Sequence, residues 1–575
     1  MIEKMTKYSF ILFKGGEDRF LEQLQELGVV DIKRSSVPVD SHSTHLLERI
    51  SQARNEIEVL ERGIDTHLTE LLDQLDSLEA AEETIAPWGE YDRRKADALG
   101  KAGVPIHFYC VSRKAFDPAW EDDYALEVID DDGKKVHFVI VGNAEGFPVA
   151  PVHKPLSTIS ELKGMAEAKE REIERYRKHL EDRKSEIPEL KQREEKLSSE
   201  LNLYLASLAG QSAVEDRLTV YEGFAPSESD AKLAEVLDSS DALWFRSEAT
   251  KEDNPPISFR NNWFTRQFEV LTDMYGRPAY DEFDPTPILG PFFLLFFAMC
   301  MGDAGYGLLL ILIGWLLKKK VPSMANLGPL VMMLGVGTFL VGIVLHTFLG
   351  INLYTAEWVP QWLKKCMVSG SIAGYDAQMV LAVGVGIFHI CLATVVKAIC
   401  QTSRFGFAKN ISTWGWTLLI VGSVITGGLA LLGVIEMPVV KIVLIVLGIV
   451  SGLGIFFLND LHRNPLLNVG SGLWETYNTV TGLLGDVLSY LRLYALGLAG
   501  GMLGNTFNTL AGMSLGMKVP GVNYLLFIFI LLIGHVLNLA LSCLGAFVHP
   551  LRLTFVEYFK NSGYEGTGRN YSPLK

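Results

Sequence analysis

Apolar residues are unevenly distributed along the chain: the half that follows Thr286 consists largely of long apolar runs, whereas charged residues are frequent before it. Apolar runs of this kind predict transmembrane helices. We expect about eight spans, at about 287–301, 304–317, 326–348, 376–399, 412–433, 439–459, 475–503 and 522–548. The first two are short and separated only by Gly302 and Asp303, so one long broken helix is the alternative.

Loop charges favour the count of eight, because lysine and arginine concentrate on the cytoplasmic side of membrane proteins. If the N-terminal half is cytoplasmic, the outside loops contain mainly Lys364, Lys365 and Lys518. The inside segments then contain Lys318, Lys319, Lys320, Arg404, Lys409, Arg463, Lys560, Arg569 and Lys575. Merging the first two spans would reverse every later loop, so we expect both termini in the cytoplasm.

In the first half, apolar residues recur at helical spacing in two charged stretches, residues 43–84 and 156–208. The first is interrupted only by Gly63. Two amphipathic helices of similar length predict an antiparallel coiled-coil hairpin. Between them, residues 85–155 contain GVPIHFYCV and a predicted β-hairpin, VID-DDGK-KVHFVIV, which indicate a distal α/β lobe.

Two strand-then-helix patterns flank this hairpin, TKYSFILF with EDRFLEQLQEL and RLTVYEGFAP with SDAKLAEVL. They predict a proximal α/β lobe assembled from residues 1–42 and 209–250. The expected fold is therefore an α-helical polytopic membrane protein, with a membrane domain at 286–575. Its N-terminal cytoplasmic domain, residues 1–285, would be a dumbbell of two lobes joined by the coiled coil.

Composition and the absence of known motifs argue against several classes of function. A formal charge of -15 argues against a nucleic-acid binder, which normally carries a basic surface. The six cysteines form no CxxC pair, and the chain has no phosphate-binding loop, HExxH or GxSxG motif. The N-terminus lacks the long uncharged core of a signal peptide. We expect no cofactor, metal site or catalytic residue, and no ATP hydrolysis by this chain itself.

Arg492 lies deep in the apolar stretch LLGDVLSYLRLYALGLAGGML, residues 483–503. Arginine stays protonated in proteins, and its charge near the bilayer centre costs about 3 kcal/mol or more. Its helix face is otherwise small or mildly polar, which allows close approach of another helix. The residues of this face are Asn478, Gly482, Gly485, Ser489, Ala495, Leu496 and Ala499. The counter-charge of Arg492 must therefore come from another helix or another chain.

Polar residues also recur at spacings of three and four along the last span, which predicts a continuous polar stripe on one helix face. The stripe comprises His535, Asn538, Ser542, Gly545, His549 and Arg552, and Pro550 is expected to bend the helix near its end. We interpret the stripe as functional. Arg552 alone also fits a cytoplasmic flank whose side chain extends to lipid headgroups.

The other polar residues of the membrane half have simpler interpretations. Asp486 is not on the face of Arg492, so it is either a polar lining residue or a packing contact with an inner loop. Glu475 is expected at the start of its helix, and Asp303 in a turn. His346 and His389 have no evident partner, and we interpret both as structural.

Three segments carry a resemblance to a known family. VLSYLRLYALGLAGG resembles the seventh membrane helix of the large stator subunit, called subunit a or subunit I, of rotary vacuolar and archaeal-type ATPases. FEVLTDMYGRPAYDEFDPTPILGPFFLLFFAMCMGDAGYGLLL resembles the family's first membrane helices, and FVHPLRLTFVEYFK resembles the end of its eighth. The resemblance covers essentially the whole chain, and the short soluble half resembles the bacterial or archaeal branch.

The resemblance implies a function. In that family, an arginine matching Arg492 faces a rotating ring of proteolipid subunits, each with an ion-binding carboxylate, and one matching Arg552 lies close to it. Eukaryotic members have histidine and glutamate where this chain has Gly500 and Ser542, so those two roles are not transferred. The expected lining residues of the two ion half-channels are Asn478, Ser489, Asp486, His535, Asn538, Ser542 and His549.

The implied protein is a non-catalytic stator subunit of the cell membrane, coupling H+ or Na+ translocation to ATP hydrolysis or synthesis. Its implied partners are the proteolipid c/K ring, peripheral-stalk subunits of the E/G type bound by the cytoplasmic domain, a central-stalk subunit that caps the ring, and membrane lipids. A stand-alone secondary transporter or channel is the alternative, although no inverted repeat is visible among the spans. A membrane-anchored scaffold is a third possibility.

Overall fold

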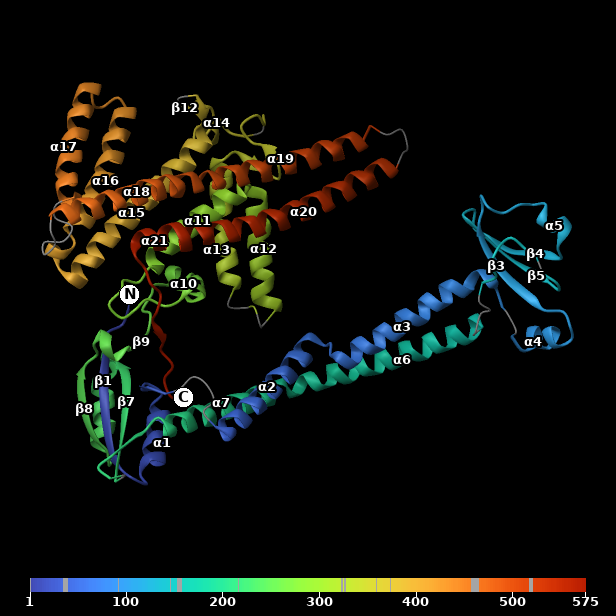
Figure 1. Ribbon diagram of the computed structural model, residues 1–575, viewed down its shortest axis with the longest axis horizontal. Helices are drawn as coiled ribbons and strands as arrows, with labels where there is room; N and C mark the ends of the chain where they lie inside the picture. The colour runs from blue at the N-terminus through green and yellow to red at the C-terminus, as the bar shows by residue number, and fades with distance from the viewer. Residues whose placement is uncertain are drawn as a thin grey trace. The chain divides into compact units, whose positions relative to one another are not determined.

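The first half of the chain folds into helices and strands, and the apolar second half is mainly helical (Figure 1). The computed structural model describes residues 2–34, 40–90, 93–144, 146–152, 158–215, 217–321, 324, 327–357, 359–372, 374–456, 465–516 and 521–575. Arg463, Lys518 and residues 156–157 of the expected hairpin lie outside these ranges. The chain divides into two compact units, Met1–Lys33 with Gln211–Pro573 and Arg34–Gly210 with Leu574–Lys575.

Four helices form the rod of the second unit: α2 (Ser41–Arg62), α3 (Thr66–Ile85), α6 (Ile159–Arg183) and α7 (Ile187–Leu208). Helix α2 packs on α7 and α3 on α6, so the two arms run antiparallel (Figure 1). The apolar residues at helical spacing form the seam between the arms. Buried members of the seam are Leu46, Ile50, Leu60, Leu68, Leu71, Ile173, Leu180 and Leu197.

The first arm is not continuous, contrary to the single helix expected over residues 43–84. Gly63 ends α2 in the left-handed conformation, with a φ of 68°, and Asp65 begins α3 by accepting a hydrogen bond from Leu68 N at 2.7 Å. Tyr176 of the other arm donates its hydroxyl to Asp65 at 2.6 Å. A glycine in the left-handed region is a strong helix stop, and the apolar periodicity did not reveal it.

A small antiparallel sheet of order β3-β5-β4 forms the lobe at the end of this rod. Its strands are β3 (Ile106–Ser112), β4 (Leu126–Asp131) and β5 (Lys135–Val141), with α4 (Arg93–Lys101) and α5 (Trp120–Asp123) beside them. On the central strand β5, Val136, Phe138 and Ile140 are inaccessible to solvent, and the polar His137 is buried among them.

The other unit begins with a sheet of order β2-β7-β1-β8, with β6 added on β7. Strand β1 pairs with β7 in antiparallel register from Met5–Pro226 to Phe13–Leu218. The elements are β1 (Met5–Phe13), α1 (Glu17–Leu27), β2 (Asp31–Ile32), β6 (Gln211–Ala213), β7 (Leu218–Pro226), α8 (Asp230–Asp238) and β8 (Leu243–Glu248). The sequence patterns predicted β1, α1, β7 and α8 and missed the edge strand β8.

Short elements lead from this lobe to the membrane half: β9 (Pro256–Ile257), α9 (Trp263–Arg266) and α10 (Glu269–Tyr275). The C-terminal residues return to the same place. Strand β14 (Arg569–Asn570) pairs with β9, and the Arg569 guanidinium lies 3.3 Å from the buried Asp31 carboxylate. The last helix and the lobe are therefore joined by a tail of ordered backbone.

Within the described residues, five helical stretches are long and apolar enough to cross a membrane: Ala377–Phe405, Ile411–Leu431, Met437–Phe456, Asn468–Ser514 and Val522–Ser562. The protein is thus a mostly helical membrane protein with an N-terminal α/β region. The helices are α11 (Thr286–Met301), α12 (Ala304–Lys320), α13 (Gly328–Val344), α15 (Ala377–Phe405), α16 (Ile411–Leu431), α17 (Met437–Phe456), α18 (Pro465–Ser489), α19 (Leu491–Ser514), α20 (Val522–Arg552) and α21 (Phe559–Ser562).

The first two apolar runs form separate helices. Gly302 ends α11 in the left-handed conformation, and the extended Asp303 caps α12. Helices α12 and α13 pack closely along glycines; a Cβ at Gly342, for example, would lie 2.2 Å from the backbone N of Ala304. Between α13 and α15 lie β10 (Thr347–Phe348), β11 (Ile351–Asn352), α14 (Gln361–Lys364), β12 (Ser371–Ile372) and β13 (Tyr375–Asp376).

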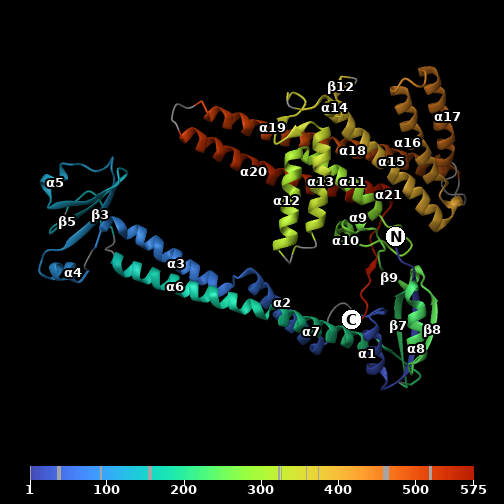
Figure 2. The ribbon, with the colours of Figure 1, turned by 180° about the vertical axis from the view of Figure 1, so that it is seen from behind.

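The two helices expected to carry the ion path extend beyond their apolar runs of about 475–503 and 522–556. Helix α18 begins at Pro465, so Glu475 lies well inside the helix, and the interpretation of Glu475 as its start was wrong. Polar residues end an apolar run without ending the helix, which explains the difference. Helices α19 and α20 run side by side and cross α12 and α13 steeply (Figures 1 and 2).

Candidate functional site

Arg492 occupies the first turn of α19, next to the junction with α18 at Tyr490. Tyr490 is fully buried, and its carbonyl accepts the Leu493 amide at 3.1 Å. The Nη1 atom of Arg492 is buried and has no hydrogen-bond partner among the described residues. A buried N–H group of a charged guanidinium is costly when it has no partner, so a counter-charge outside this chain would stabilise it.

A cavity of about 260 Å³ lies on the side of Arg492 nearer the proximal lobe; we call it the lobe-side cavity. Asn478 and Asp486, both expected lining residues, form part of its wall, as does Glu475. The Asp486 carboxylate accepts a hydrogen bond from Asn561 Nδ2 at 2.8 Å and lies 3.5 Å from Lys560 Nζ. The remaining lining residues are Thr394, Lys397, Thr413, Trp416, Thr417, Ile420, Thr479, Gly482, Leu483, Lys560 and Asn561.

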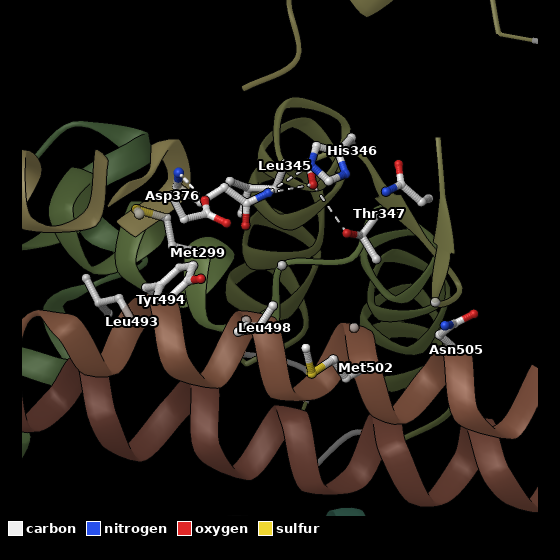
Figure 3. A pocket seen from close by; sticks show the side chains of 16 residues that line it. Met299, Leu345, His346, Thr347, Asp376, Leu493, Tyr494, Leu498, Met502 and Asn505 are labelled. Carbon is white, nitrogen blue, oxygen red and sulfur yellow. Dashed lines mark hydrogen bonds between the residues drawn. The ribbon is translucent and has the colours of Figure 1, made fainter. Parts of the chain in front are cut away.

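A second cavity of about 260 Å³ lies beside the next turns of α19, under the connection between α13 and α15; we call it the loop-side cavity (Figure 3). Its polar groups include His346, Asp376, Gln378, Tyr494 and Asn505. Gln378 Nε2 and His346 Nε2 are 3.1 Å apart. Figure 3 shows His346 and Thr347 across the cavity from Leu498 and Met502 of α19.

The two cavities follow one continuous pair of helices and lie on opposite sides of Arg492. Asp486 of the lobe-side cavity precedes Arg492 by six residues, or about 9 Å along the helix axis, and Tyr494 of the loop-side cavity follows it by about 3 Å. Along the helix axis, Arg492 therefore lies between the residues of α18 and α19 that line the two cavities. The sequence interpretation placed His346 in a span, without an evident partner, and gave it a structural role; it did not consider Asp376. The structure places both residues in the connection between α13 and α15.

The polar stripe of α20 forms a hydrogen-bond network with α12 and α19. Tyr306 Oη lies 2.8 Å from His535 Nδ1 and accepts Asn538 Nδ2 at 2.8 Å, and Asn538 Nδ2 also donates to the Gly500 carbonyl at 2.9 Å. Ser542 donates to Asn538 Oδ1 at 3.3 Å. The walls of the two cavities include none of these three stripe residues, so their lining role stays a prediction.

The C-terminal end of the stripe approaches Arg492. His549 is half-buried and lies within electrostatic range of both Arg492 and Arg552, whereas Arg552 is exposed. Pro550 lies inside α20, and the helix widens into a π-helical segment at Leu553–Tyr558, three residues later. Irregular turns of this kind are frequent at functional sites.

His389 has the partner that the sequence did not reveal. Its buried ring lies 2.9 Å, at Nδ1, from the Tyr490 hydroxyl and stacks on Tyr558 with ring centroids 4.6 Å apart. One turn earlier on α15, Gly386 contacts the Tyr490 ring so closely that a Cβ would lie 2.3 Å from Cγ. Helix α15 therefore fixes the junction that precedes Arg492.

Asp303 is a turn residue, as expected, and it also connects two segments. Its carboxylate accepts hydrogen bonds from Gly305 N at 2.8 Å, Leu349 N at 2.7 Å and Gly350 N at 2.7 Å. These hydrogen bonds stabilise the Asp303 carboxylate, because the residue is only 1% exposed to solvent.

Among the described residues, no group of three His, Cys, Asp or Glu side chains is placed to hold a metal ion.

Part of the Arg492 face is open. Gly485, Ala495 and Ala499 are exposed, and no heavy atom of the described residues comes within 4 Å of a Cβ built at Gly485. Ser489 lies on the same face and donates its hydroxyl to the Gly485 carbonyl at 3.0 Å. The small residues thus leave room for a further helix, as the sequence predicted.

Comparison with known proteins gives the family. Relatives include the A-type ATP synthase subunit I of Methanocaldococcus jannaschii, 31% identical over 63% of this chain and 55% of that protein. The V-type ATP synthase subunit I of Borreliella burgdorferi is 25% identical over 100% of this chain and 99% of its own length, and that of Treponema pallidum is 24% identical over 100% of both. The chain spans about half the length of the archaeal relatives.

Residues 150–344 and 474–575, more than half of the chain, match the V-type ATPase 116kDa subunit family. The second segment contains α19 with Arg492 and α20 with its polar stripe. The chain therefore belongs to the V-type ATPase 116kDa subunit family, as a subunit I of the V/A-type ATPases.

Proposed function

We propose that this chain is the stator subunit that carries ions past a rotating proteolipid ring, with Arg492 separating two half-channels. The observation that carries the proposal is the placement of two polar cavities along one helix pair, on opposite sides of an arginine whose Nη1 atom is buried without a partner. The names of the relatives, ATP synthase subunits I, support the same assignment.

Electrostatics gives the mechanism. A ring carboxylate that carries its ion is neutral and tolerates lipid, whereas the ionised form is stabilised when it reaches the guanidinium of Arg492. Release therefore occurs at Arg492, and rebinding occurs from the other cavity. Because arginine stays protonated, it also repels a cation that would otherwise leak directly between the cavities.

In this proposal, the lobe-side cavity opens to the cytoplasm and the loop-side cavity to the outside. Asn478, Asp486 and Ser489 belong to the cytoplasmic path, and Arg552 and His549 complete the positive field near Arg492. The network of His535, Asn538 and Ser542 borders the outer path and holds α19 against α20.

The three shorter apolar helices, α11, α12 and α13, complete a set of eight spans with both termini in the cytoplasm. Lysines Lys318, Lys319 and Lys320 at the end of α12 agree with this orientation. The two α/β lobes and the coiled coil form the cytoplasmic arm that holds the peripheral-stalk subunits. This arm keeps Arg492 stationary while the ring turns.

Replacing Arg492 tests the proposal. In the purified complex reconstituted in liposomes, R492A should abolish ATP-driven ion transport and leave the subunit composition unchanged. R492K keeps the charge and loses the planar multidonor group, so it should also transport poorly. R246K, at an exposed position of strand β8, is the matched control and should transport normally. Transport by R492A at the native rate would contradict the assignment, and transport by the chain alone in vesicles would identify a secondary transporter instead.

A further inference from the structure

Glu557 is a buried carboxyl group that the mechanism above does not use. It lies in the π-helical segment that follows α20 and is 2% exposed. Its Oε2 atom has no hydrogen-bond partner among the described residues. Burying an ionisable group in a membrane domain is unfavourable, and such groups usually mark an ion or proton path.

The groups around Glu557 connect it to the lobe-side cavity. The Ser489 hydroxyl lies within hydrogen-bonding reach of the Glu557 carboxyl, and Asp486 and Arg552 lie within electrostatic range. Asn561, a residue of the cavity wall, donates Nδ2 to the Asp486 carboxylate at 2.8 Å and to the main-chain carbonyl of Glu557, one helical turn earlier, at 2.6 Å. Glu557 is therefore one side chain removed from the wall of the cavity.

Ser489 lies between Glu557 and Arg492. Ser489 precedes Arg492 by three residues and shares its helix face, at about 4.5 Å of axial rise. Glu557 lies within the π-helical turn, where the additional residue rotates the side chains relative to those of a regular α-helix. Glu557 thus adjoins the lobe-side cavity through Asn561, and it adjoins the Arg492 face of the helix through Ser489.

We propose that Glu557 exchanges protons between the lobe-side cavity and the ring carboxylate at Arg492, and hence that the transported ion is a proton. Protonated Glu557 gives its proton to the ionised ring carboxylate, so that one O–H bond breaks as the other forms. The Glu557 carboxylate then takes a proton from hydronium in the cavity, which leaves water. Transport in the other direction reverses both steps. The inference rests on the proposed function.

Removing titration without changing shape separates this role from a packing role. E557Q keeps the volume and hydrogen-bonding atoms of the side chain and loses the exchangeable carboxyl proton. General acid–base groups contribute on the order of 100-fold or more to proton transfer, so ATP-driven proton uptake by the reconstituted complex should fall at least about tenfold. E557D keeps a carboxyl group and should retain part of the rate. E565Q removes an exposed carboxylate eight residues later and should behave as native.

The outcomes are distinct. Native-rate proton uptake by an assembled E557Q complex overturns the inference, and E557L decides the question in the same way if E557Q does not assemble. Sodium-dependent uptake by the native complex, measured with radioactive sodium and without proton movement, also overturns it. R492A in the same experiment isolates the proposed function: if R492A is inactive while E557Q is native, only the role of Glu557 fails, and if R492A transports normally, the stator assignment fails.

Discussion

Gly386 offers a direct way to move Arg492 without changing it. A Cβ at position 386 would lie 2.3 Å from Cγ of Tyr490, whereas carbon atoms pack at about 3.5–4.0 Å. In G386A, α15 and the Tyr490 ring must therefore separate by about 1.2–1.7 Å. The ring has little freedom to turn away, because it is fully buried and its hydroxyl bonds to His389 on the same helix.

The expected loss follows from this displacement. Overpacking of a buried contact costs about 1–3 kcal/mol, which a complex of this size tolerates. Tyr490 begins the turn that carries Arg492, so the guanidinium should shift by about 1 Å, a misplacement that costs up to about 100-fold in a pre-organised site. We predict that G386A assembles and transports ions about 10- to 100-fold more slowly than the native complex.

The assay is ATP-driven ion uptake by complexes in liposomes, normalised to ATPase activity and to subunit stoichiometry. G384A is the matched control: it makes the same change two residues earlier on α15, where no heavy atom lies within 4 Å of the added Cβ. Both variants gain the same helix propensity. If G386A and G384A show equal transport and equal melting temperatures, the contact between α15 and Tyr490 does not position Arg492.

Two further predictions concern the N-terminal region. The pKa of the Asp253 carboxyl is lowered from 3.8 to about 2, chiefly by the hydrogen bond from Lys7; this stabilisation is present above pH 3.8 and is lost as the pH falls toward about 2. K7M should therefore lose less stability over that pH range, and equal acid sensitivity of both proteins in tryptophan fluorescence would contradict the coupling. In the coiled coil, L60A should cost about 2–5 kcal/mol and accelerate hydrogen exchange of α2 and α3, since Leu60 is inaccessible to solvent, whereas L47A, at an exposed position of α2, should change little.

The spacing and length of apolar runs predicted the helical rod and most of the apolar helices, because these depend on residues close in sequence. They did not reveal the break at Gly63 or the edge strand β8. Nor did they indicate that helix α18 begins ten residues before Glu475. These features depend on backbone conformation and on strand partners distant in sequence, which side-chain polarity does not record.

The residues of the candidate site also divide into those that local sequence indicated and those that only the fold revealed. Asn478 and Asp486 could be found because they share a span with Arg492, and both line a cavity. His346, Asp376 and Glu557 were missed, because their positions depend on how a connection and a π-helical turn fold against that span. In the sequence, a polar residue next to a span looks like any other polar loop residue, and only the fold shows that it lies near the span of Arg492.

The C-terminal tail has a mechanical consequence. In the proposed stator, a ring that turned against α20 would exert a sideways drag on this helix, and side-chain packing against neighbouring helices would resist that drag only weakly. The tail provides a second connection, since β14 pairs with β9 in a separate two-stranded sheet and Arg569 forms an ion pair with Asp31, which belongs to β2 of the N-terminal sheet. Tension in α20 would therefore pass along the backbone of the tail to the β14–β9 strand pair, which it would load in shear, and through the Arg569–Asp31 ion pair to the sheet.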